Sequence, residues 1–424
     1  MSIMIDVDKE QDEKMPVLLI ARTDDRTRSD TAVLEEISAL VKTAEMCPVD
    51  SVVIRRYEPT PKFGIGSGKA EEIKNIAISC GAEAIIFDFN ITPTQQRNWE
   101  KLTDLTCFDR QEVIIRIFAD RAMTREAVLQ IELARLKYSL PRLAHTYEAL
   151  SRQRGGRYGT RGGGETQLEL DRRSILKKIA RNQAELVEVR KDRSTMRKRR
   201  ENAALPACAI VGYTNAGKST LLNTLTGADV LAEDKLFATL DPTTRQYNVP
   251  SGRKILLTDT VGFIHDLPHT LIDAFRATLE EAAYASAVVI ILDASDTKIQ
   301  LHYETTLAVL DEIGARSQPQ LIVLNKADIL DEHTRARTAS EFPGAILISA
   351  KTGEGFDAFA EALEKMVSGF DREYHIPLDR GDLVAQIHRE GSVRDVEYEE
   401  QYIVVRANTD GRIAALLREF EFHA

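Results

Sequence analysis

Short apolar runs alternate with amphipathic segments along residues 16–120. The apolar runs predict strands at Val17–Arg22, Ser51–Tyr57, Glu83–Asp88 and Glu112–Phe118. The amphipathic segments predict helices at Ala32–Met46 and Lys69–Gly81, the second with Gly81 as its C-terminal cap. Because strand–helix–strand alternation is typical of parallel sheets, we expect residues 1–120 to form a small parallel α/β subdomain.

A long helical hairpin is predicted over residues 121–203. Residues 121–150 are rich in good helix formers, and a second, basic helical segment runs from Leu168 to about Asn202. Residues 152–168 between them, RQRGGRYGTRGGGETQL, contain many Gly and Arg residues and no apolar run. Such a segment cannot bury a core, so we expect it to be a loop that joins the two helices.

Alternation of strands and helices returns in residues 204–370. Strands are predicted at Ala207–Gly212, Lys254–Asp259, Ala287–Asp293, Gln320–Asn325 and Ala345–Ala350. The pattern breaks near Phe370, and residues 371–424 predict a small α+β domain with one helix and two strands. We therefore expect an α/β chain of four parts, in which the second sheet is mixed.

The charges are unevenly distributed along a chain whose net charge is −10. Residues 151–200 contain 16 Lys and Arg residues against 6 Asp and Glu residues, an excess of ten positive charges. A concentrated positive segment on an acidic chain indicates a directed contact with phosphate groups.

The composition predicts a cytoplasmic protein, with peripheral membrane association left open, and we expect a monomer. No window resembles a membrane span of about 20 apolar residues. The acidic start, MSIMIDVDKEQDEK, lacks the apolar segment of a signal peptide. Cys47, Cys80, Cys107 and Cys208 show no metal-type spacing, which fits a reducing compartment without disulfides or a zinc site.

The segment GYTNAGKST (Gly212–Thr220) matches the phosphate-binding pattern G-x-x-x-x-G-K-[ST]. It follows a predicted strand and opens a predicted helix, as this motif requires. The glycines let backbone N–H groups surround phosphate oxygens, Lys218 reaches the β- and γ-phosphates, and the Ser219 hydroxyl is a ligand for Mg²⁺. The alternative is a glycine-rich turn without a ligand.

Three further motifs lie at predicted strand ends. In DTVG (Asp259–Gly262), Asp259 can hold Mg²⁺ through water and the Gly262 N–H can reach the γ-phosphate. In NKAD (Asn325–Asp328), the carboxylate can accept hydrogen bonds from guanine N1–H and the exocyclic amine, which selects GTP over ATP. The backbone of SAK (Ser349–Lys351) can contact guanine O6. Together with the phosphate loop, these motifs predict a P-loop GTP-binding domain.

The segment FATLDPTTR (Phe237–Arg245) lies where a GTPase has its first switch. One threonine there should complete the Mg²⁺ shell and sense the γ-phosphate. The residues alone leave Thr239, Thr243 and Thr244 as candidates, and a polar surface loop as the alternative.

Phe263 follows Gly262, where Ras-like enzymes have a glutamine that orients the attacking water. A phenylalanine cannot bind water, so we expect slow intrinsic hydrolysis and assign no catalytic residue. His265 is nearby but is interpreted as a solvated surface residue. Asn215 indicates a K⁺ site beside the phosphates, the alternative being a neutral loop residue.

A second Gly-Lys segment, GIGSGKAE (Gly64–Glu71), departs from the phosphate-loop pattern. Phe63 replaces the first glycine, and Ala70 replaces the hydroxyl residue that binds Mg²⁺. It is interpreted as a loop leading into a helix, with a phosphate contact at the helix N-terminus left open.

The chain resembles the HflX family, bacterial GTPases related to translation factors. The GTPase motifs match, and GSGKAEEI and GGRYGTRGGGETQLELDRR, in the N-terminal half, are specific to that family. The resemblance covers nearly the whole chain and implies that Thr239 is the switch threonine on Mg²⁺. It also implies binding to the large ribosomal subunit and splitting of stalled ribosomes under stress.

The resemblance further implies that the hairpin presents its loop to ribosomal RNA. Arg154, Arg157 and Arg161 can pair with phosphates or stack on bases, and Tyr158 offers a stacking face. The alternative is a solvated linker between domains.

The expected cofactors are Mg²⁺, held by Ser219 and Thr239, and K⁺ at Asn215. The residues expected to contact GTP are Gly212, Tyr213, Thr214, Asn215, Ala216, Gly217, Lys218, Ser219, Thr220, Phe237, Ala238, Thr239, Leu240, Asp241, Asp259, Thr260, Val261, Gly262, Asn325, Lys326, Ala327, Asp328, Ser349, Ala350 and Lys351.

Three other functions are weighed against ribosome splitting. A tRNA-modifying GTPase would need a catalytic group such as a C-terminal cysteine, but the last cysteine is Cys208. A membrane-associated GTPase is disfavoured because no membrane span is predicted. An RNA-binding module in which GTP only stabilises the fold is compatible with Phe263.

Overall fold

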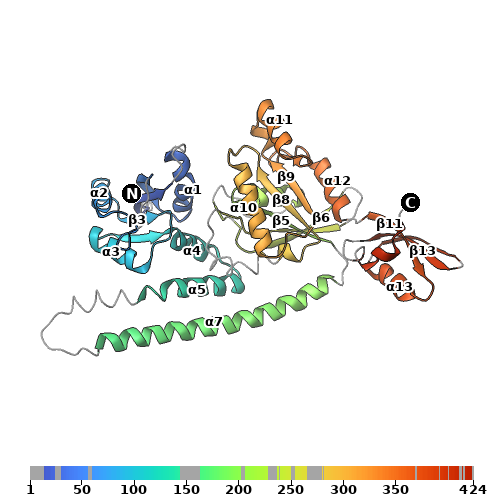
Figure 1. Cartoon of the computed structure of the whole chain (residues 1–424), viewed down its shortest axis with the longest axis horizontal. Coiled ribbons are helices and arrows are strands. Elements are labelled where there is room, and N and C mark those ends of the chain that lie inside the picture. The colour runs from blue at the N-terminus through green and yellow to red at the C-terminus, as the bar shows by residue number, and fades with distance from the viewer. Residues whose placement is uncertain are drawn as a thin grey trace, which may run out of the picture. The chain divides into compact units, whose positions relative to one another are not determined.

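In the computed structural model, the described residues form three β-sheets that follow one another along the chain (Figure 1). Contacts divide the chain into two compact units, Met1–Val187 with Pro268–Ala274, and Glu188–Leu267 with Phe275–Ala424. The residues that the structure describes are 14–23, 30–55, 60–143, 163–201, 206–227, 236–237, 239–249, 254–264, 279, 281–367, 370–390, 392–399, 401–409, 413 and 416–422.

The first sheet has four parallel strands in the order β2-β1-β3-β4, which confirms the predicted parallel α/β architecture. Its elements are β1 (Pro16–Arg22), α1 (Asp30–Thr43), β2 (Cys47–Ile54), α2 (Ser67–Ser79), β3 (Ala84–Phe87), α3 (Pro93–Thr103), β4 (Thr106–Asp109) and α4 (Arg110–Arg121). Gly81, just beyond α2, has a φ of +68°, which fits its predicted place at the end of that helix.

The predicted strand Glu112–Phe118 is wrong, because these residues lie in α4. The Asp109 side chain accepts a hydrogen bond from the Glu112 N–H (2.9 Å), which caps the helix. The fourth strand is β4, a short segment just before this cap. The apolar run alone did not distinguish the two structures, because a short buried strand and a buried helix share that pattern. Helix α3 was also missed, since it buries only Trp99 and Thr103.

The predicted hairpin consists of α5 (Arg125–Ser139) and α7 (Gly163–Glu201). Within the described part of the helix predicted over 121–150, α5 begins after its cap Thr124 and ends at Ser139. Residues 144–150 lie outside the described residues. Helix α7 begins at Gly163, so the last six residues of the predicted loop 152–168 are helical. The cost of a helical glycine, about 1 kcal/mol, does not prevent a long helix from extending through Gly163 and Gly164.

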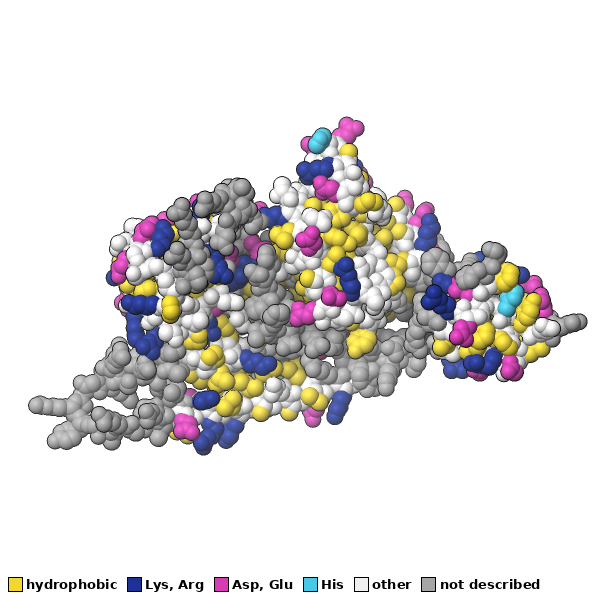
Figure 2. Space-filling model, in the orientation of Figure 1, with side chains coloured by type: hydrophobic (Ala, Val, Ile, Leu, Met, Phe, Trp, Pro, Cys, Tyr) yellow, Lys and Arg dark blue, Asp and Glu magenta, His cyan; other side chains and the backbone are white. Residues whose placement is uncertain are grey.

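Helices α5 and α7 lie side by side (Figure 1). The Asn182 side chain donates a hydrogen bond of 3.1 Å to Glu132 across the pair, and Leu186 is buried. On the face shown in Figure 2, hydrophobic side chains gather along these helices. Two of the hydrophobic residues of α5 and α7, Val128 and Leu176, are about half exposed.

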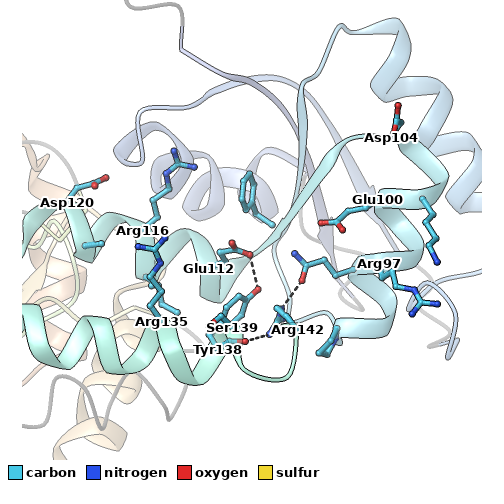
Figure 3. A pocket seen from close by; sticks show the side chains of 16 residues that line it. Arg97, Glu100, Asp104, Glu112, Arg116, Asp120, Arg135, Tyr138, Ser139 and Arg142 are labelled. Atoms are coloured by element: carbon cyan, nitrogen blue, oxygen red, sulfur yellow. Dashed lines mark hydrogen bonds between the residues drawn. The ribbon is translucent and has the colours of Figure 1, made fainter. Parts of the chain in front are cut away.

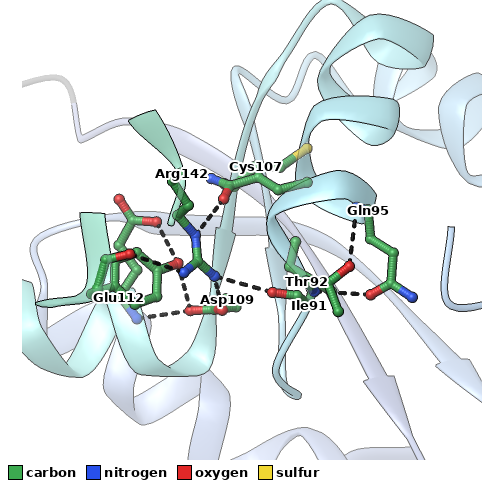
Figure 4. Close-up of polar contacts among 9 residues, drawn as sticks. Ile91, Thr92, Gln95, Cys107, Asp109, Glu112 and Arg142 are labelled. Carbon is green, nitrogen blue, oxygen red and sulfur yellow. Dashed lines mark hydrogen bonds and ion pairs between the residues drawn. The ribbon is translucent and has the colours of Figure 1, made fainter. Parts of the chain in front are cut away.

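Arg142, just beyond α5, connects the hairpin to the first sheet (Figure 4). Its guanidinium donates hydrogen bonds of 3.0 Å to the Asp109 carboxylate and to the Ile91 carbonyl oxygen. The Tyr138 hydroxyl donates a further bond of 3.0 Å to Asp109. Asp109 is almost fully buried, so these bonds replace the water that its carboxylate loses on folding.

The second sheet has six strands in the order β10-β9-β8-β5-β7-β6. It is mixed, as predicted, because β6 runs antiparallel to β7 while the other pairs are parallel. Its strands are β5 (Ala207–Gly212), β6 (Thr243–Asn248), β7 (Lys254–Asp259), β8 (Ala287–Asp293), β9 (Gln320–Asn325) and β10 (Ile346–Leu347). The helices with defined bounds are α8 (Lys218–Thr226), α10 (Ile299–Glu312), α11 (Glu332–Glu341) and α12 (Phe356–Val367).

The third sheet is antiparallel, with the order β11-β13-β12. It comprises β11 (Phe370–Pro377), β12 (Ser392–Tyr398) and β13 (Tyr402–Thr409), and α13 (Gly381–Glu390) packs on it. Among the described residues this makes three strands and one helix rather than the predicted two strands and one helix. The α+β character of this segment is as predicted.

Candidate nucleotide-binding site

The phosphate-loop motif lies between the end of β5 and the start of α8. Gly217 has a φ of +92°, and a Cβ added there would lie 2.2 Å from the Asn325 side chain. A Cβ on Gly212 would lie 2.2 Å from the Ile291 carbonyl oxygen. Asn215 has a φ of +62°, a left-handed conformation that asparagine tolerates better than most residues. The close approach of neighbouring groups therefore requires glycine at both ends of the loop.

Lys218 is buried inside this loop. Its ammonium group donates hydrogen bonds to the carbonyl oxygens of Tyr213 (2.8 Å) and Gly212 (3.2 Å). Burial lowers the pKa of Lys218 to about 8, while the nearby Asp259 carboxylate acts in the opposite direction. The loop thus holds a positive charge where the motif expects phosphate oxygens.

Oxygen atoms of Ser219, Thr239 and Asp259 meet at the predicted metal position. The Ser219 hydroxyl lies 2.7 Å from the Thr239 hydroxyl and donates a bond of 2.7 Å to Asp259. Burial raises the pKa of Asp259, and its other carboxylate oxygen, Oδ1, has no hydrogen-bond partner among the described residues. By contrast, Thr243 and Thr244 both lie in β6, where the Thr244 hydroxyl contacts that of Thr258. The geometry therefore favours Thr239 as the switch threonine.

The segment DTVG and Phe263 lie against the phosphate loop. The Phe263 N–H donates to the Gly212 carbonyl (3.0 Å), and the Thr214 N–H donates to the Phe263 carbonyl (2.8 Å). The Phe263 side chain is fully buried, so its ring faces the protein interior and not solvent. His265 lies outside the described residues.

The predicted guanine-reading residues come together from two loops. The Asn325 amide donates to the Ala216 carbonyl oxygen, and its oxygen accepts from the Ala350 N–H, both at 2.8 Å. The Ser349 hydroxyl donates a 2.7 Å bond to Asp328, which lowers the pKa of that exposed carboxyl group. This end of the site therefore presents an ionised carboxylate at the surface.

The other predicted contact residues fall around the same site. Phe237, Leu240, Thr260, Val261 and Ala327 are buried, whereas Lys351 is exposed. Thr220 lies in α8, Asp241 lies two residues after Thr239, and Lys326 forms an ion pair of 2.7 Å with Asp293. Ala238 lies outside the described residues, as do the predicted RNA-binding residues Arg154, Arg157, Tyr158 and Arg161.

Sequence reasoning missed two polar residues, Asp293 and Asp296, at the end of β8 and just after it. Asp293 pairs with Lys326 of the NKAD motif, and Asp296 lies 3.3 Å from His302 at the start of α10. The segment DASD, at the end of a buried strand, is the signal that would have indicated them, because strand ends in such sheets carry binding residues.

The second Gly-Lys segment forms the loop before α2 and the start of that helix, as interpreted from sequence. Lys69 forms an ion pair of 2.7 Å with Glu72 on its own helix. Phe63 is buried, and its ring lies 5.4 Å from that of Trp99 in an edge-to-face arrangement. Phe63 therefore has a packing role at the position where the phosphate-loop motif has its first glycine, and a phosphate contact at the start of α2 stays a prediction.

A groove of about 1100 Å³ lies in the first unit, between α3, α4 and α5. Figure 3 shows Arg116 and Arg135 at one end, Arg97 at the other, and the carboxylates of Glu100 and Glu112 between them. Burial raises the pKa of both glutamates. This mixed lining favours neither anions nor cations, and none of the residues that line the groove belongs to a nucleotide-binding motif.

Three family models match successive parts of the chain between residues 31 and 326. Residues 31–119 match a family model described as GTP-binding GTPase N-terminal, and residues 121–200 match one described as GTP-binding GTPase Middle Region. Residues 207–326 match a model described as 50S ribosome-binding GTPase.

The chain is 46% identical over 390 residues to GTPase HflX of Akkermansia muciniphila, covering 89% of each protein. It is 41% identical to GTPase HflX of Escherichia coli, covering 84% of this chain and 83% of the relative. A GTP-binding protein from Sulfolobus solfataricus, solved in complex with GDP, is 25% identical over 83% of this chain and 98% of its own, with a TM-score of 0.45. On the identity and coverage of its sequence relatives, this chain belongs to the HflX family of GTPases.

Proposed function

We propose that this GTPase binds the large ribosomal subunit and dissociates stalled or idle ribosomes under stress, with GTP hydrolysis stimulated by the ribosome. The proposal rests on family membership and on the position of Phe263. Its ring is fully buried, and its backbone is hydrogen-bonded to the phosphate loop. No water-orienting side chain stands at this position, so efficient hydrolysis needs a group from a partner.

GTP would lie along the edge formed by the phosphate loop, DTVG, NKAD and SAK. Lys218 would contact the β- and γ-phosphates, and Asp328 would accept hydrogen bonds from guanine. Thr214 Oγ1 is buried and has no hydrogen-bond partner among the described residues, which fits a polar ligand beside it.

The residues at the metal position fit Mg²⁺. Hydroxyl and carboxylate oxygens are its preferred protein ligands, and the unpaired oxygen of Asp259 supports such a site. Ser219 and Thr239 would bind the ion directly, and Asp259 would hold it through water. When bound, Mg²⁺ would neutralise charge on the phosphate oxygens.

We also propose that K⁺ binds beside Asn215, which is exposed in the phosphate loop. There it would offset the charge that develops on the phosphates. Replacing K⁺ by Na⁺ should then slow hydrolysis, and Asn215→Ala should remove the difference between the two ions. Equal rates of the unaltered protein in both salts would contradict this site.

The basic segment between α5 and α7 would contact ribosomal RNA through Arg154, Arg157, Tyr158 and Arg161. Support comes from the ten excess positive charges of residues 151–200. Arginine binds phosphates and stacks on bases, which suits RNA loops.

An RNA-modifying function has less support, because the last cysteine of the chain is unsuited to act as a nucleophile. Cys208 is buried in β5, and burial raises the pKa of its thiol to about 12. It would therefore remain a neutral thiol near pH 7. A GTP-dependent RNA-binding switch that does not split ribosomes is left as the alternative outcome of the test below.

The test measures steady-state GTP hydrolysis in K⁺ buffer, with and without purified large ribosomal subunits. We expect stimulation of roughly tenfold or more, since arginine-type groups supplied in trans give larger effects. Unchanged rates would exclude the subunit as activator. Sedimentation of intact ribosomes incubated with the protein and GTP then separates splitting from mere binding.

A charge-matched pair of variants tests the RNA contact. Arg154→Ala, Arg157→Ala and Arg161→Ala together should weaken subunit binding and its salt dependence, because phosphate contacts release counterions. The control replaces three exposed basic residues of α7, Arg172, Lys177 and Lys178, by Ala. An equal loss of affinity for the subunit in both variants would show that net charge, and not the loop, determines binding.

A further inference from the structure

Tyr213 of the phosphate loop stacks on His302 of α10. The two ring centres lie 3.7 Å apart, and the ring planes differ by 12°. Tyr213 is 7% exposed, and the His302 side chain is 13% exposed. His302 belongs to none of the GTPase motifs, yet its ring contacts the phosphate loop. The motifs therefore do not explain its role.

Asp296 contacts the edge of the His302 imidazole and thereby orients the ring. His302 Nδ1 lies 3.3 Å from one oxygen of the Asp296 carboxylate. The other oxygen accepts a hydrogen bond of 2.8 Å from the Lys298 N–H. The carboxylate is thus fixed by the start of α10, and it favours the ring orientation in which Nδ1 carries the proton.

The backbone of Tyr213 contacts both parts of the site that would surround the γ-phosphate. Its carbonyl oxygen accepts the 2.8 Å bond from the Lys218 ammonium group. It also forms a parallel bridge with Phe263, through the bonds that Phe263 makes to the neighbouring residues Gly212 and Thr214. A shift of Tyr213 would therefore displace the phosphate lysine and the DTVG segment together.

Tyr213 lies in a stretch of unusual backbone. Gly212 before it has a φ of +150°, and Asn215 two residues later has a φ of +62°. A left-handed conformation at a residue other than glycine, such as Asn215, persists when surrounding contacts hold it. The stacked imidazole supplies a contact of this kind, because it fixes the side chain that projects from the middle of the stretch.

We propose that His302 is a positioning residue for GTP, which acts by holding Tyr213 and, through it, the phosphate-binding loop. Asp296 sets the ring plane of His302. The inference rests on the GTPase activity of the family and is independent of the ribosome.

The adjacent residue in α10 provides a matched control. Tyr303 packs edge-to-face against Phe342, with ring centres 5.5 Å apart and planes at 86°. Tyr303→Ala removes an aromatic contact from the same helix without removing the stack on Tyr213. A role of His302 in stability alone would make the two variants behave alike.

The experiment measures release of a fluorescent GDP analogue from the full chain by stopped flow, without ribosomes. A stacked aromatic pair contributes enough free energy that its loss in His302→Ala should speed release of the analogue about 2- to 10-fold. His302→Phe keeps a ring against Tyr213 and should restore most of the slow release, whereas Tyr303→Ala should leave the release rate unchanged. Steady-state kinetics should show the change in KM for GTP and little change in kcat.

A double-mutant cycle decides whether His302 acts through Tyr213. Tyr213→Ala should also speed release, and the double variant should release the analogue no faster than the faster single variant. Additive effects, or normal release from His302→Ala, would overturn the proposal. Failure of ribosome stimulation in the test above would leave this result unaffected, because no ribosome is present.

Discussion

The Thr214 N–H donates a hydrogen bond of 2.8 Å to the Phe263 carbonyl oxygen, so the phosphate loop and the segment DTVGF are in direct contact. Gly262 lies next to this contact. A Cβ added to Gly262 would lie 2.9 Å from Thr214 Cα and 3.0 Å from Lys218 Nζ. The absence of a side chain at Gly262 is therefore a requirement of the packing between the two segments.

Gly262→Ala should lower kcat/KM for GTP by roughly tenfold or more. The added methyl group must separate two backbone segments, and overpacking of this kind costs about 1–3 kcal/mol. The measurement is steady-state hydrolysis in the presence of the activating partner. Gly68→Ala is the control, because no atom lies within 4 Å of its added Cβ. Normal kinetics in Gly262→Ala would show that the two segments separate freely.

Lys218→Met should abolish GTP binding but stabilise the nucleotide-free protein. Burial lowers the pKa of Lys218 to about 8 from 10.5, so the unfolded chain binds this proton more tightly than the folded chain. The charged lysine therefore costs stability below pH 8, by up to about 3 kcal/mol, and the cost disappears as the pH rises to about 10.5.

Chemical denaturation at pH 7 and at pH 10 checks this prediction. The variant should have the higher free energy of unfolding at pH 7, and the difference should shrink at pH 10. Lys351→Met, at an exposed lysine of the same site, should change stability by less than about 0.5 kcal/mol. A less stable Lys218→Met protein at pH 7 would mean that the ammonium group stabilises the empty loop.

Asp328→Asn should reduce the preference for GTP over ATP. The carboxylate is ionised, since the Ser349 hydrogen bond lowers its pKa, and hydrogen bonds to charged groups contribute about 1.5–3 kcal/mol each. Loss of even one such bond to guanine predicts at least about tenfold weaker GTP binding. Competition binding with both nucleotides measures the ratio, and an unchanged ratio would show that another group recognises the base.

Arg142→Ala should destabilise the first unit by about 3–5 kcal/mol, because it leaves the Asp109 carboxylate buried without its cation. Burial raises the pKa of Asp109, and Arg142 opposes this rise, so the variant should raise the pKa further. A carboxyl group whose pKa is raised in the folded protein lowers the free energy of unfolding only at pH values where the same group is ionised in the unfolded chain. The deficit should therefore grow as the pH rises through the usual carboxyl range.

Denaturation of Arg142→Ala at several pH values tests this relationship. Adding Asp109→Asn should restore part of the loss by removing the buried charge. The control, Arg125→Ala, breaks an exposed ion pair with Glu185 and should cost less than about 1 kcal/mol. A deficit that does not vary with pH would show that Arg142 acts by packing alone.

The sequence by itself was enough to predict the motifs that consist of residues close together in the chain. The phosphate loop, DTVG and NKAD each consist of neighbouring residues, and each follows a strong apolar strand. Parallel sheets place the ends of such strands along one edge, so the strand pattern is enough to predict that these motifs converge. The short apolar run Glu112–Phe118 shows the limit of this reasoning, because the helix cap at Asp109 and the pairing of β4 decided its structure.

Tertiary structure alone decided the contacts between residues far apart in the chain. Thr239 was one of three candidates from the residues, and only the fold brings its hydroxyl to Ser219. His302 had no motif to mark it, yet packing places its ring on Tyr213. The physical reason is that local sequence fixes backbone conformation and chemical type. Which distant side chains share one buried space depends on how the helices pack against the sheet.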